Sequence, residues 1–347
     1  MKKYPLIGKC LVVGIVLLFV GAGIIPSALS EQTHGKKIIT VDNEPGDADY
    51  TSIKEAINHS SPGDTIEVFS GTYNESNITI KTSNLILIGI PHEVGIGNDT
   101  GKPVIEISSF AIDVFYIIAN NVSISGFMIN GSEGCYLYNV IRIWYADHCT
   151  LFNNDIFLKG GTFFSVLRIL DANYTMIQNT TVNGGDCLLW LLESHDCWIL
   201  NNSFLNCTGQ DGLSLQGSNF TIIKNIICNC YYDGIFVTGG RNIVIDNNEL
   251  RNNVEGIWLR GTRSFTIKVT RNNFNRNHEN AVFIGTGIRF SDLVFSNNYW
   301  NRPHILPKPI FGHGFLLLFL SPEGIPIGLP IPWICFDWHP AQKPYAI

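Results

Sequence analysis

The sequence predicts an all-β fold, a single-stranded parallel β-helix with a short N-terminal capping helix and an irregular C-terminal tail. An apolar phrase with asparagine returns about every 24 residues, for example at 199–204, 245–250 and 295–300. Self-similarity at such a period indicates stacked units. Each unit also carries apolar residues two apart, which lie on one face of a strand, and it lacks the helical 3.6-residue period. Stacked units of this kind place equivalent residues of neighbouring coils about 4.8 Å apart.

Residues 1–30 are typical of a signal peptide or an N-terminal membrane anchor. Lys2 and Lys3 precede an apolar run at 10–25, and small residues follow at 26–30. The run is short for a bilayer span, which needs about 20 residues, so cleavage is favoured. Membrane contact is therefore expected only through residues 10–25 of an uncleaved form. Asn-x-Ser/Thr sequons recur after this segment, as expected of a secreted or cell-surface glycoprotein.

The β-helix is expected to span residues 36–300, and residues 36–90 should form its N-terminal cap. Ser52 and Glu55 have the spacing of a capping box, and Ile53, Ala56 and Ile57 share one helical face. A short amphipathic helix here would cover the open end of the stack, whose unpaired strand edges would otherwise invite aggregation.

Regular coils are expected over residues of about 119–300. The last apolar residue of each phrase serves as an anchor, and the anchors are Ile129, Ile156, Val182, Phe204, Ile227, Leu250, Phe274 and Trp300. A second strand in each unit should point two residues inward, at Ile141/Ile143, Leu167/Ile169, Leu189/Leu191, Leu213/Leu215, Ile235/Val237, Ile257/Leu259 and Val282/Ile284.

An asparagine column accompanies the anchors. The residue two places before the anchor is asparagine at Asn154, Asn202, Asn225, Asn248, Asn272 and Asn298. Asparagine tolerates the left-handed backbone of a sharp bend. Its amide can also donate to one neighbouring coil and accept from the other. We therefore expect a stacked asparagine ladder along the solenoid.

Residues 301–347 no longer follow the period. They are rich in proline, glycine and apolar residues. The apolar run at 315–320 is too short to cross a bilayer. We expect this segment to be a C-terminal capping tail that folds back over the coils.

Charge and cysteine content restrict the function. Only 15% of residues are charged, the net charge is −6 and no basic patch occurs, so nucleic acid is not an expected partner. Cys207 and Cys230 each lie three residues after an anchor in adjacent coils. Stacking would bring their Cα atoms to about 4.8 Å, within the range of a disulfide, so this pair is a disulfide candidate.

Three acids share one column of the repeat. Asp211, Asp233 and Glu255 stand two residues before an inward position in consecutive coils. Like charges about 4.8 Å apart repel each other and need compensation, which a calcium ion or sugar hydroxyls would supply. The alternative is turn chemistry, because Asp before Gly212 or Gly234 favours a bend. No cofactor is required by this pattern, and calcium is the one it would accommodate.

Aromatic side chains are expected on the outer face beside these acids. Trp190, Phe236 and Trp258 occupy an outward position, and the same column contains Arg142, Arg168, Ser214 and Phe283. Aromatic rings cover the apolar faces of sugars while acids bind hydroxyls, so a carbohydrate-binding track is one interpretation. The alternative is that the apolar tail covers these rings.

Several motifs resemble a known family. The phrases at 49–57, 61–66 and 71–73 are similar to the opening of right-handed parallel β-helix proteins with the pectin-lyase fold. The Asn-Asn and Asp-Gly-Ile/Leu phrases resemble NosD-like, CASH-type repeats, and 298–300 with 336–340 resemble the end of secreted archaeal proteins of that type. The resemblance implies the fold. It also admits lyases, hydrolases, epimerases, non-catalytic surface proteins and NosD-like copper handling.

Enzyme motifs of these relatives are not matched. Gly312-His313-Gly314 occurs without the paired aspartates of a galacturonase, and Arg302-Pro303 lacks the second arginine of a pectate lyase. Histidines share no column that would suit copper. We therefore expect a non-catalytic protein that binds a polysaccharide or cell-envelope glycan, or an adhesin-like envelope component. The alternatives are a polysaccharide lyase or glycoside hydrolase that uses Asp211, Asp233 and Glu255 as catalytic residues, and copper handling.

Overall fold

The computed structural model describes residues 35–95, 97–107, 111–133, 136–160, 162–261, 266–286, 292–320 and 326–347. Residues 36–347 form one structural unit. The predicted signal peptide or membrane anchor at residues 1–30 lies outside the described residues. Over the ranges described, no helix combines the length and apolar character needed to cross a membrane.

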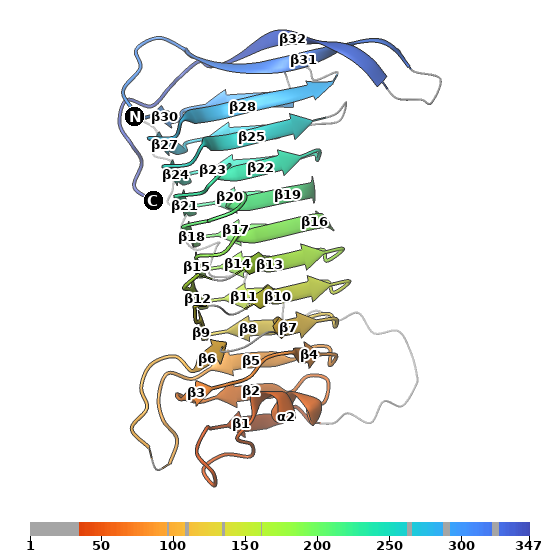
Figure 1. Ribbon diagram of the computed structural model, residues 1–347, viewed down its shortest axis with the longest axis vertical. Helices are drawn as coiled ribbons and strands as arrows, with labels where there is room; N and C mark the ends of the chain where they lie inside the picture. Colours follow the sequence, from red (N-terminus) through yellow and green to blue (C-terminus); the bar gives the residue numbers. More distant parts are fainter. Residues whose placement is uncertain are drawn as a thin grey trace, which may run out of the picture. The chain divides into compact units, whose positions relative to one another are not determined.

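Three columns of parallel strands build the stack (Figure 1). The first column contains β1 (Ile38–Val41), β2 (Thr65–Val68), β5 (Ile86–Gly89), β8 (Ser123–Ser125), β11 (Thr150–Phe152), β14 (Met176–Gln178), β17 (Trp198–Leu200), β20 (Thr221–Ile223), β23 (Ile243–Asp246), β26 (Ile267–Thr270) and β29 (Leu293–Ser296). The second contains β4 (Ile78–Ile80), β7 (Ala111–Ile117), β10 (Tyr136–Trp144), β13 (Thr162–Leu170), β16 (Leu189–His195), β19 (Leu213–Ser218), β22 (Ile235–Thr238), β25 (Glu255–Gly261) and β28 (Glu279–Thr286). The third contains β3 (Thr72–Tyr73), β6 (Val104–Ile107), β9 (Met128–Gly131), β12 (Asp155–Leu158), β15 (Thr181–Asn183), β18 (Ser203–Leu205), β21 (Ile226–Cys228), β24 (Glu249–Arg251), β27 (Asn273–Asn275) and β30 (Tyr299–Trp300).

The register between coils follows the sequence repeat. Ile199 pairs with Ile222 and Ile222 with Ile245, while Phe204 pairs with Ile227. All eight anchors are buried, as are the apolar residues five positions before them. Each buried side chain of this size contributes about 1.5–3 kcal/mol, so the inward columns carry most of the stability. The predicted all-β, single-stranded parallel β-helix is confirmed.

The predicted asparagine ladder is present. The amide nitrogen of Asn202 donates to Oδ1 of Asn225 at 3.0 Å, and Asn225 donates to Asn248 at the same distance. Asn248, Asn272 and Asn298 continue the ladder. Each Oδ1 also accepts the backbone N–H of the preceding ladder residue, as between Asn202 and Asn225 at 2.9 Å. The ladder thus satisfies polar groups that the tight turn would otherwise bury without partners.

The left-handed backbone expected of these asparagines occurs instead at the residues that precede them. The left-handed residue of the turn is the one before the ladder asparagine, for example Asn201 (φ 54°) and Asn247 (φ 55°). Lys224 (φ 58°) and Arg271 (φ 55°) take the same place in other coils. None of the ladder asparagines has a positive φ.

The N-terminal helix α2 (Ile53–Asn58) forms as predicted and buries Ile53, Ala56 and Ile57. Ser52 accepts the N–H of Glu55 at 3.2 Å. The helix start is also bound by a residue from elsewhere in the chain: the Glu75 carboxylate accepts the N–H groups of Ile53 at 2.8 Å and Lys54 at 2.9 Å. A distant carboxylate can therefore replace the local one at the positive end of the helix.

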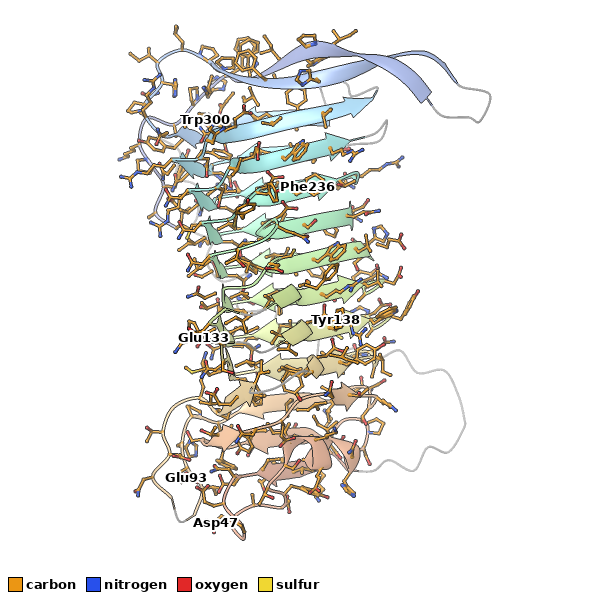
Figure 2. The ribbon with its side chains drawn as sticks, in the orientation of Figure 1. Asp47, Glu93, Glu133, Tyr138, Phe236 and Trp300 are labelled. Atoms are coloured by element: carbon orange, nitrogen blue, oxygen red, sulfur yellow. The ribbon has the colours of Figure 1, made fainter. Side chains whose placement is uncertain are left out.

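The C-terminal tail is more regular than expected. Strands β31 (Lys308–Leu320) and β32 (Pro326–Asp337) form an antiparallel hairpin, and β31 pairs with β28 of the last coil. Figure 1 shows the hairpin across the end of the stack, and Figure 2 shows Trp300 beneath it. Irregular structure was expected because this segment is rich in proline. Edge strands tolerate proline, so the segment can still form strands.

One predicted strand register was wrong. Val282 and Ile284 were expected to point inward and Phe283 outward, but Leu259 pairs with Phe283, which is 1% exposed. Ala281 is the other inward residue. Three consecutive apolar residues fit either face of a strand, and a slip of one residue exchanges the faces.

Candidate functional site

The outer face of the second column carries one continuous row of residues. Arg142 pairs with Arg168, and Arg168 with Trp190. Ser214 follows, and the row continues through Phe236 and Trp258. The structure thus brings the predicted aromatic residues Trp190, Phe236 and Trp258 into one row, and all of them are partly exposed.

Aromatic and arginine side chains pack together within this row. The guanidinium group of Arg168 lies 4.9 Å from the ring centre of Trp190, and its pKa is lowered by burial and by Arg142. Arg142 is compensated differently, by an ion pair with the buried Asp113 at 2.6 Å. Phe236 and Trp258 lie 5.4 Å apart. No salt bridge involving Arg168 occurs among the described residues. The guanidinium group of Arg168 is held in the row mainly by contacts with aromatic rings.

Asp211 and Asp233 occupy the turns before β19 and β22, and Glu255 is the first residue of β25. Asp233 is only 2% exposed, and its Oδ1 has no hydrogen-bond partner. Burial, followed by Glu255 and Asp211, raises the pKa of Asp233 to about 9. Burial likewise raises the pKa of Asp211 to about 6. Asp233 is therefore a neutral buried acid at pH 7, and its side chain is not presented to a ligand at the surface.

The glycines beside these acids explain part of the motif. A Cβ on Gly212 would lie 2.7 Å from both Sγ of Cys230 and the carbonyl oxygen of Gly234. A Cβ on Gly234 would lie 2.7 Å from the carbonyl oxygen of Gly256. Glycine is required here because the next coil approaches closely, so coil packing accounts for the glycines of the Asp-Gly phrases.

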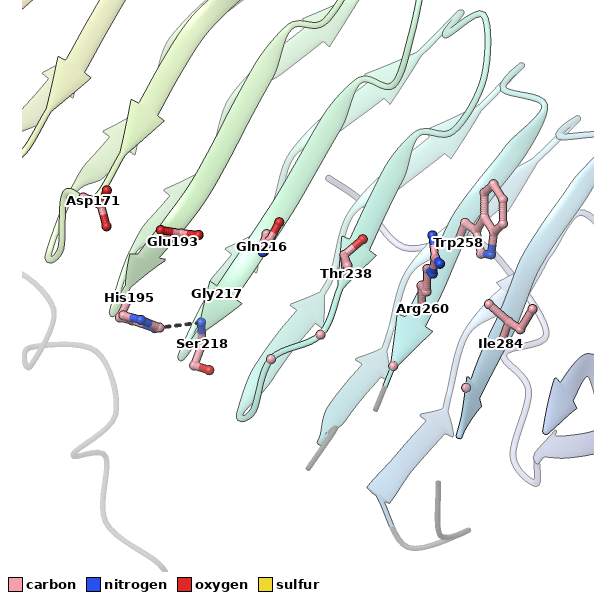
Figure 3. Close-up of a pocket in the computed structure, with 14 residues that line it drawn as sticks. Asp171, Glu193, His195, Gln216, Gly217, Ser218, Thr238, Trp258, Arg260 and Ile284 are labelled. Carbon is pink, nitrogen blue, oxygen red and sulfur yellow. Dashed lines mark hydrogen bonds between the residues drawn. The ribbon is translucent and has the colours of Figure 1, made fainter. Parts of the chain in front are cut away.

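A separate groove opens at the other end of the same strands (Figure 3). It has a volume of about 1090 Å³ and extends across β16, β19, β22 and β25. Glu193, Gln216, Thr238 and Arg260 contribute polar side chains from successive coils, and Trp258 lies beside Arg260. The groove therefore offers one polar group per coil and an aromatic ring near one end.

His195 has a defined hydrogen-bonding role at the rim of the groove. Its Nδ1 accepts the backbone N–H of Ser218 at 3.1 Å (Figure 3). Its own backbone N–H donates to Oδ1 of Asn173 at 2.9 Å. An imidazole whose Nδ1 accepts a hydrogen bond carries its proton on Nε2 when neutral. His195 can therefore offer an N–H donor to a ligand in the groove.

Of the groove residues, only Trp258 was predicted from the sequence as a binding residue. Gln216, Thr238 and Arg260 occupy the outward position two residues beyond the aromatic row and stand in register. Period-two alternation would have identified this second outward row as well. Glu193 and Asp171 escaped because they have left-handed backbone angles (φ 49° and 47°), which break the alternation.

The disulfide candidate is not formed. Cys207 and Cys230 are both buried and free. The Cys207 thiol lies 2.7 Å from the carbonyl oxygen of Asp186 and 3.2 Å from that of Asp211. Backbone carbonyls of its own coil and of the preceding coil thus surround the thiol, and the Cys230 side chain is a further hydrogen-bond partner. The two cysteines lie in adjacent coils as expected.

In the described part of the chain, the one group of three or more His, Cys, Asp or Glu side chains with ligand atoms within 4.8 Å of one another is Asp42, Glu44 and Glu93. It contains no histidine or cysteine, which are the ligands that copper prefers. Asp211, Asp233 and Glu255 do not converge to this extent.

Known proteins with this architecture include polysaccharide-modifying enzymes. Residues 165–315 match the family described as "Right handed beta helix region". An alginate lyase from Paenibacillus sp. str. FPU-7 is 11% identical and has a TM-score of 0.52 over 76% of this chain and 95% of that chain. Pectate lyase Pel9A is 16% identical (TM-score 0.44, 77% and 71% covered), and the Azotobacter vinelandii mannuronan C-5 epimerase AlgE4 A-module is 14% identical (TM-score 0.42, 69% and 79% covered).

The family match and the similarity to the alginate lyase define the fold class. The chain is a right-handed parallel β-helix, and an alginate lyase is among its structural neighbours. At such low identity the likeness concerns the fold alone, which suits both catalytic and non-catalytic roles. No curated protein matches the sequence.

Proposed function

We propose that this chain is a secreted or cell-surface β-helix protein that binds a polysaccharide or cell-envelope glycan without cleaving it. The groove beside Trp258 and Arg260 is the observation that carries the proposal. It is elongated along the stack and has a polar group on each successive coil, which suits a polymer with repeating hydroxyl groups.

The chemistry of the groove supports a sugar ligand. The Trp258 ring is 38% exposed and can pack against the apolar face of a pyranose. Glu193 and Gln216 can accept hydrogen bonds from hydroxyl groups, while Arg260 can donate hydrogen bonds to hydroxyl or carboxylate oxygens. The guanidinium group of Arg168, which lies against Trp190, and the row that leads to Trp258 favour a glycan that contains acidic sugars.

A polysaccharide lyase or glycoside hydrolase is the second candidate, because Glu193, His195 and Arg260 share this groove. Cleavage requires a base and a charge-neutralising group on the same sugar, within hydrogen-bonding distance of the reacting atoms. His195 on β16 and Arg260 on β25 are separated by three coil steps, or about 14 Å. Asp233, which lies in the column of acids outside the groove, is buried. This spacing favours binding over catalysis.

The test is binding of the full chain to an array of neutral and uronate-containing polysaccharides. We expect Trp258→Ala to weaken binding about 10-fold, because the loss of an aromatic platform costs on the order of 1.4 kcal/mol. Trp198→Ala is the matched control, since Trp198 is also 38% exposed but lies on β17 outside the groove.

Turnover is measured in parallel by reducing-end and unsaturated-product assays. No product is expected from the wild type. Product formation by the wild type that is lost in Glu193→Gln or His195→Ala would establish the enzyme instead. An array with no bound glycan, or equal losses in Trp258→Ala and Trp198→Ala, would contradict the binding groove.

A further inference from the structure

The N-terminal cap contains a carboxylate cluster far along the chain from the groove. Asp42 and Glu44 follow β1, and Glu93 lies in the loop that follows β5. One carboxylate oxygen from each of the three lies within 4.8 Å of the others. Figure 2 shows Glu93 at the end of the stack that carries β1 and β3. Residues about 50 positions apart in sequence are therefore brought to one point.

Unsatisfied oxygens converge at this point. Asp42 is 0% exposed, and neither of its carboxylate oxygens has a hydrogen-bond partner. Oδ1 of Asn43 and Oε2 of Glu44 are also buried without partners. Buried polar atoms are almost always hydrogen-bonded, and a buried carboxylate without a partner is costly. Four such oxygens on three consecutive residues indicate a cation-binding site.

The surrounding backbone holds the ligands in place. The Glu93 carboxylate accepts the N–H of Val94 at 3.1 Å and of Asp99 at 3.2 Å, which fixes its orientation in the loop. Asn43 packs on Gly71, where an added Cβ would lie 1.7 Å from Oδ1. Burial, then Glu93 and Glu44, raise the pKa of Asp42 to about 6, as expected when acids crowd without a counter-charge.

We propose that Asp42, Glu44 and Glu93 bind one calcium ion, with Oδ1 of Asn43 as a further candidate ligand. Calcium takes six to eight oxygen ligands at about 2.3–2.6 Å, so ligand oxygens up to about 4.8 Å apart can share one ion. Magnesium needs shorter contacts in a strict octahedron and retains water, so calcium fits this cluster better. The ion ties the end of β1 to the loop after β5 and so secures the first coils.

The site is tested by thermal unfolding of the full chain in EDTA, in CaCl2 and in MgCl2. Calcium at about 100 times its Kd is expected to raise the melting temperature by about 3–8 °C. Isothermal titration calorimetry should give one calcium per chain. Magnesium should produce a much smaller shift. Equal effects of the two ions, or no effect of calcium, would overturn the proposal.

Two variants locate the site. Asp42→Asn should fold in EDTA with a melting temperature at or above that of the wild type, because it removes an uncompensated buried charge. It should lose the calcium-induced shift, and Glu93→Gln should lose most of it. Glu255→Gln, in the other acidic column, is the control and should keep the full shift. A shift that persists in Asp42→Asn but disappears in Glu255→Gln would place the ion in the other column.

Discussion

At the scale of single residues, burial decides the chemistry of the acids. Asp233 and Asp171 are both aspartates near a turn, yet Asp233 is enclosed between coils while Asp171 lines the open groove. Desolvation penalises the charged form of Asp233, and the neighbouring Glu255 and Asp211 add repulsion. The repeat suggests that Asp233 is a ligand-binding acid, but burial makes it a neutral structural group at pH 7.

The stability of the protein should fall as pH rises because of Asp233. Its pKa is near 4 in the unfolded chain and about 9 in the folded one, so the folded state binds more protons between these values. Asp233→Asn should therefore match the wild type near pH 4. It should be more stable by about 1–3 kcal/mol at pH 9, as judged by urea unfolding.

Asp196→Asn serves as the control for this prediction. Asp196 is partly exposed and has a left-handed backbone (φ 55°) that asparagine tolerates, so the substitution should leave the pH dependence unchanged. A wild-type stability that stays level or rises between pH 5 and pH 9, with no difference in Asp233→Asn, would contradict the buried neutral acid.

At the scale of elements, the asparagine ladder needs an end, and the hairpin supplies it. Asp337 of β32 is 0% exposed. Its Oδ2 accepts the backbone N–H of Asn298 at 2.8 Å, the Asn298 amide at 3.2 Å and the Trp300 indole N–H at 3.0 Å. Its Oδ1 accepts N–H groups of Asn297 and His339, both at 3.1 Å. A single carboxylate thus ends the ladder and fastens the cap.

Asp337→Ala should destabilise the protein by about 3–5 kcal/mol, because it leaves several buried donors without an acceptor. Asp337→Asn should cost less, about 1–2 kcal/mol, since one oxygen is kept. Chemical denaturation measures both. Trp338→Ala is the control: this neighbour is exposed, and its loss should change stability by at most about 0.5 kcal/mol. Equal effects at positions 337 and 338 would contradict the capping role.

At the scale of the whole β-helix unit, both ends of the stack are covered by elements that break the repeat. Helix α2 contacts β1, β2 and β4 at the first coils, and the β31–β32 hairpin pairs with β28 and β29 at the last. An uncovered end would expose a row of unpaired N–H and C=O groups. The caps therefore set where the solenoid stops.

Removal of residues 301–347 should cause self-association. The truncated chain would lose Asp337 and expose the edges of β28 and β29 together with the anchor Trp300. Exposed strand edges pair with further copies of the chain. Size-exclusion chromatography with light scattering should show a larger mass for the truncated chain than for the full chain at equal concentration. Equal masses would show that the hairpin is dispensable as a cap.

Periodicity made most of the fold predictable. Inward columns, the asparagine ladder and helix α2 all follow from local patterns, because a repeated unit can bury its apolar face only against another copy of itself. Prediction failed where the pattern was ambiguous, as at Phe283 between two apolar neighbours, or where proline content suggested irregularity, as in β31 and β32. Of the candidate site, the aromatic row and the outward row beside it follow from the alternation, whereas Glu193 and Asp171 do not, because their left-handed backbone breaks it.

The sequence by itself determined the solenoid, its coil spacing and which residues share a column, because these depend on period and side-chain type alone. Only the tertiary structure decided which polar residues are buried and which are offered to a ligand. Asp233 became enclosed, Arg260 and Glu193 came to line a groove, and Asp42, Glu44 and Glu93 met at one point. Solvent exposure and convergence depend on how coils and loops pack in space, and no local pattern of residues encodes that packing.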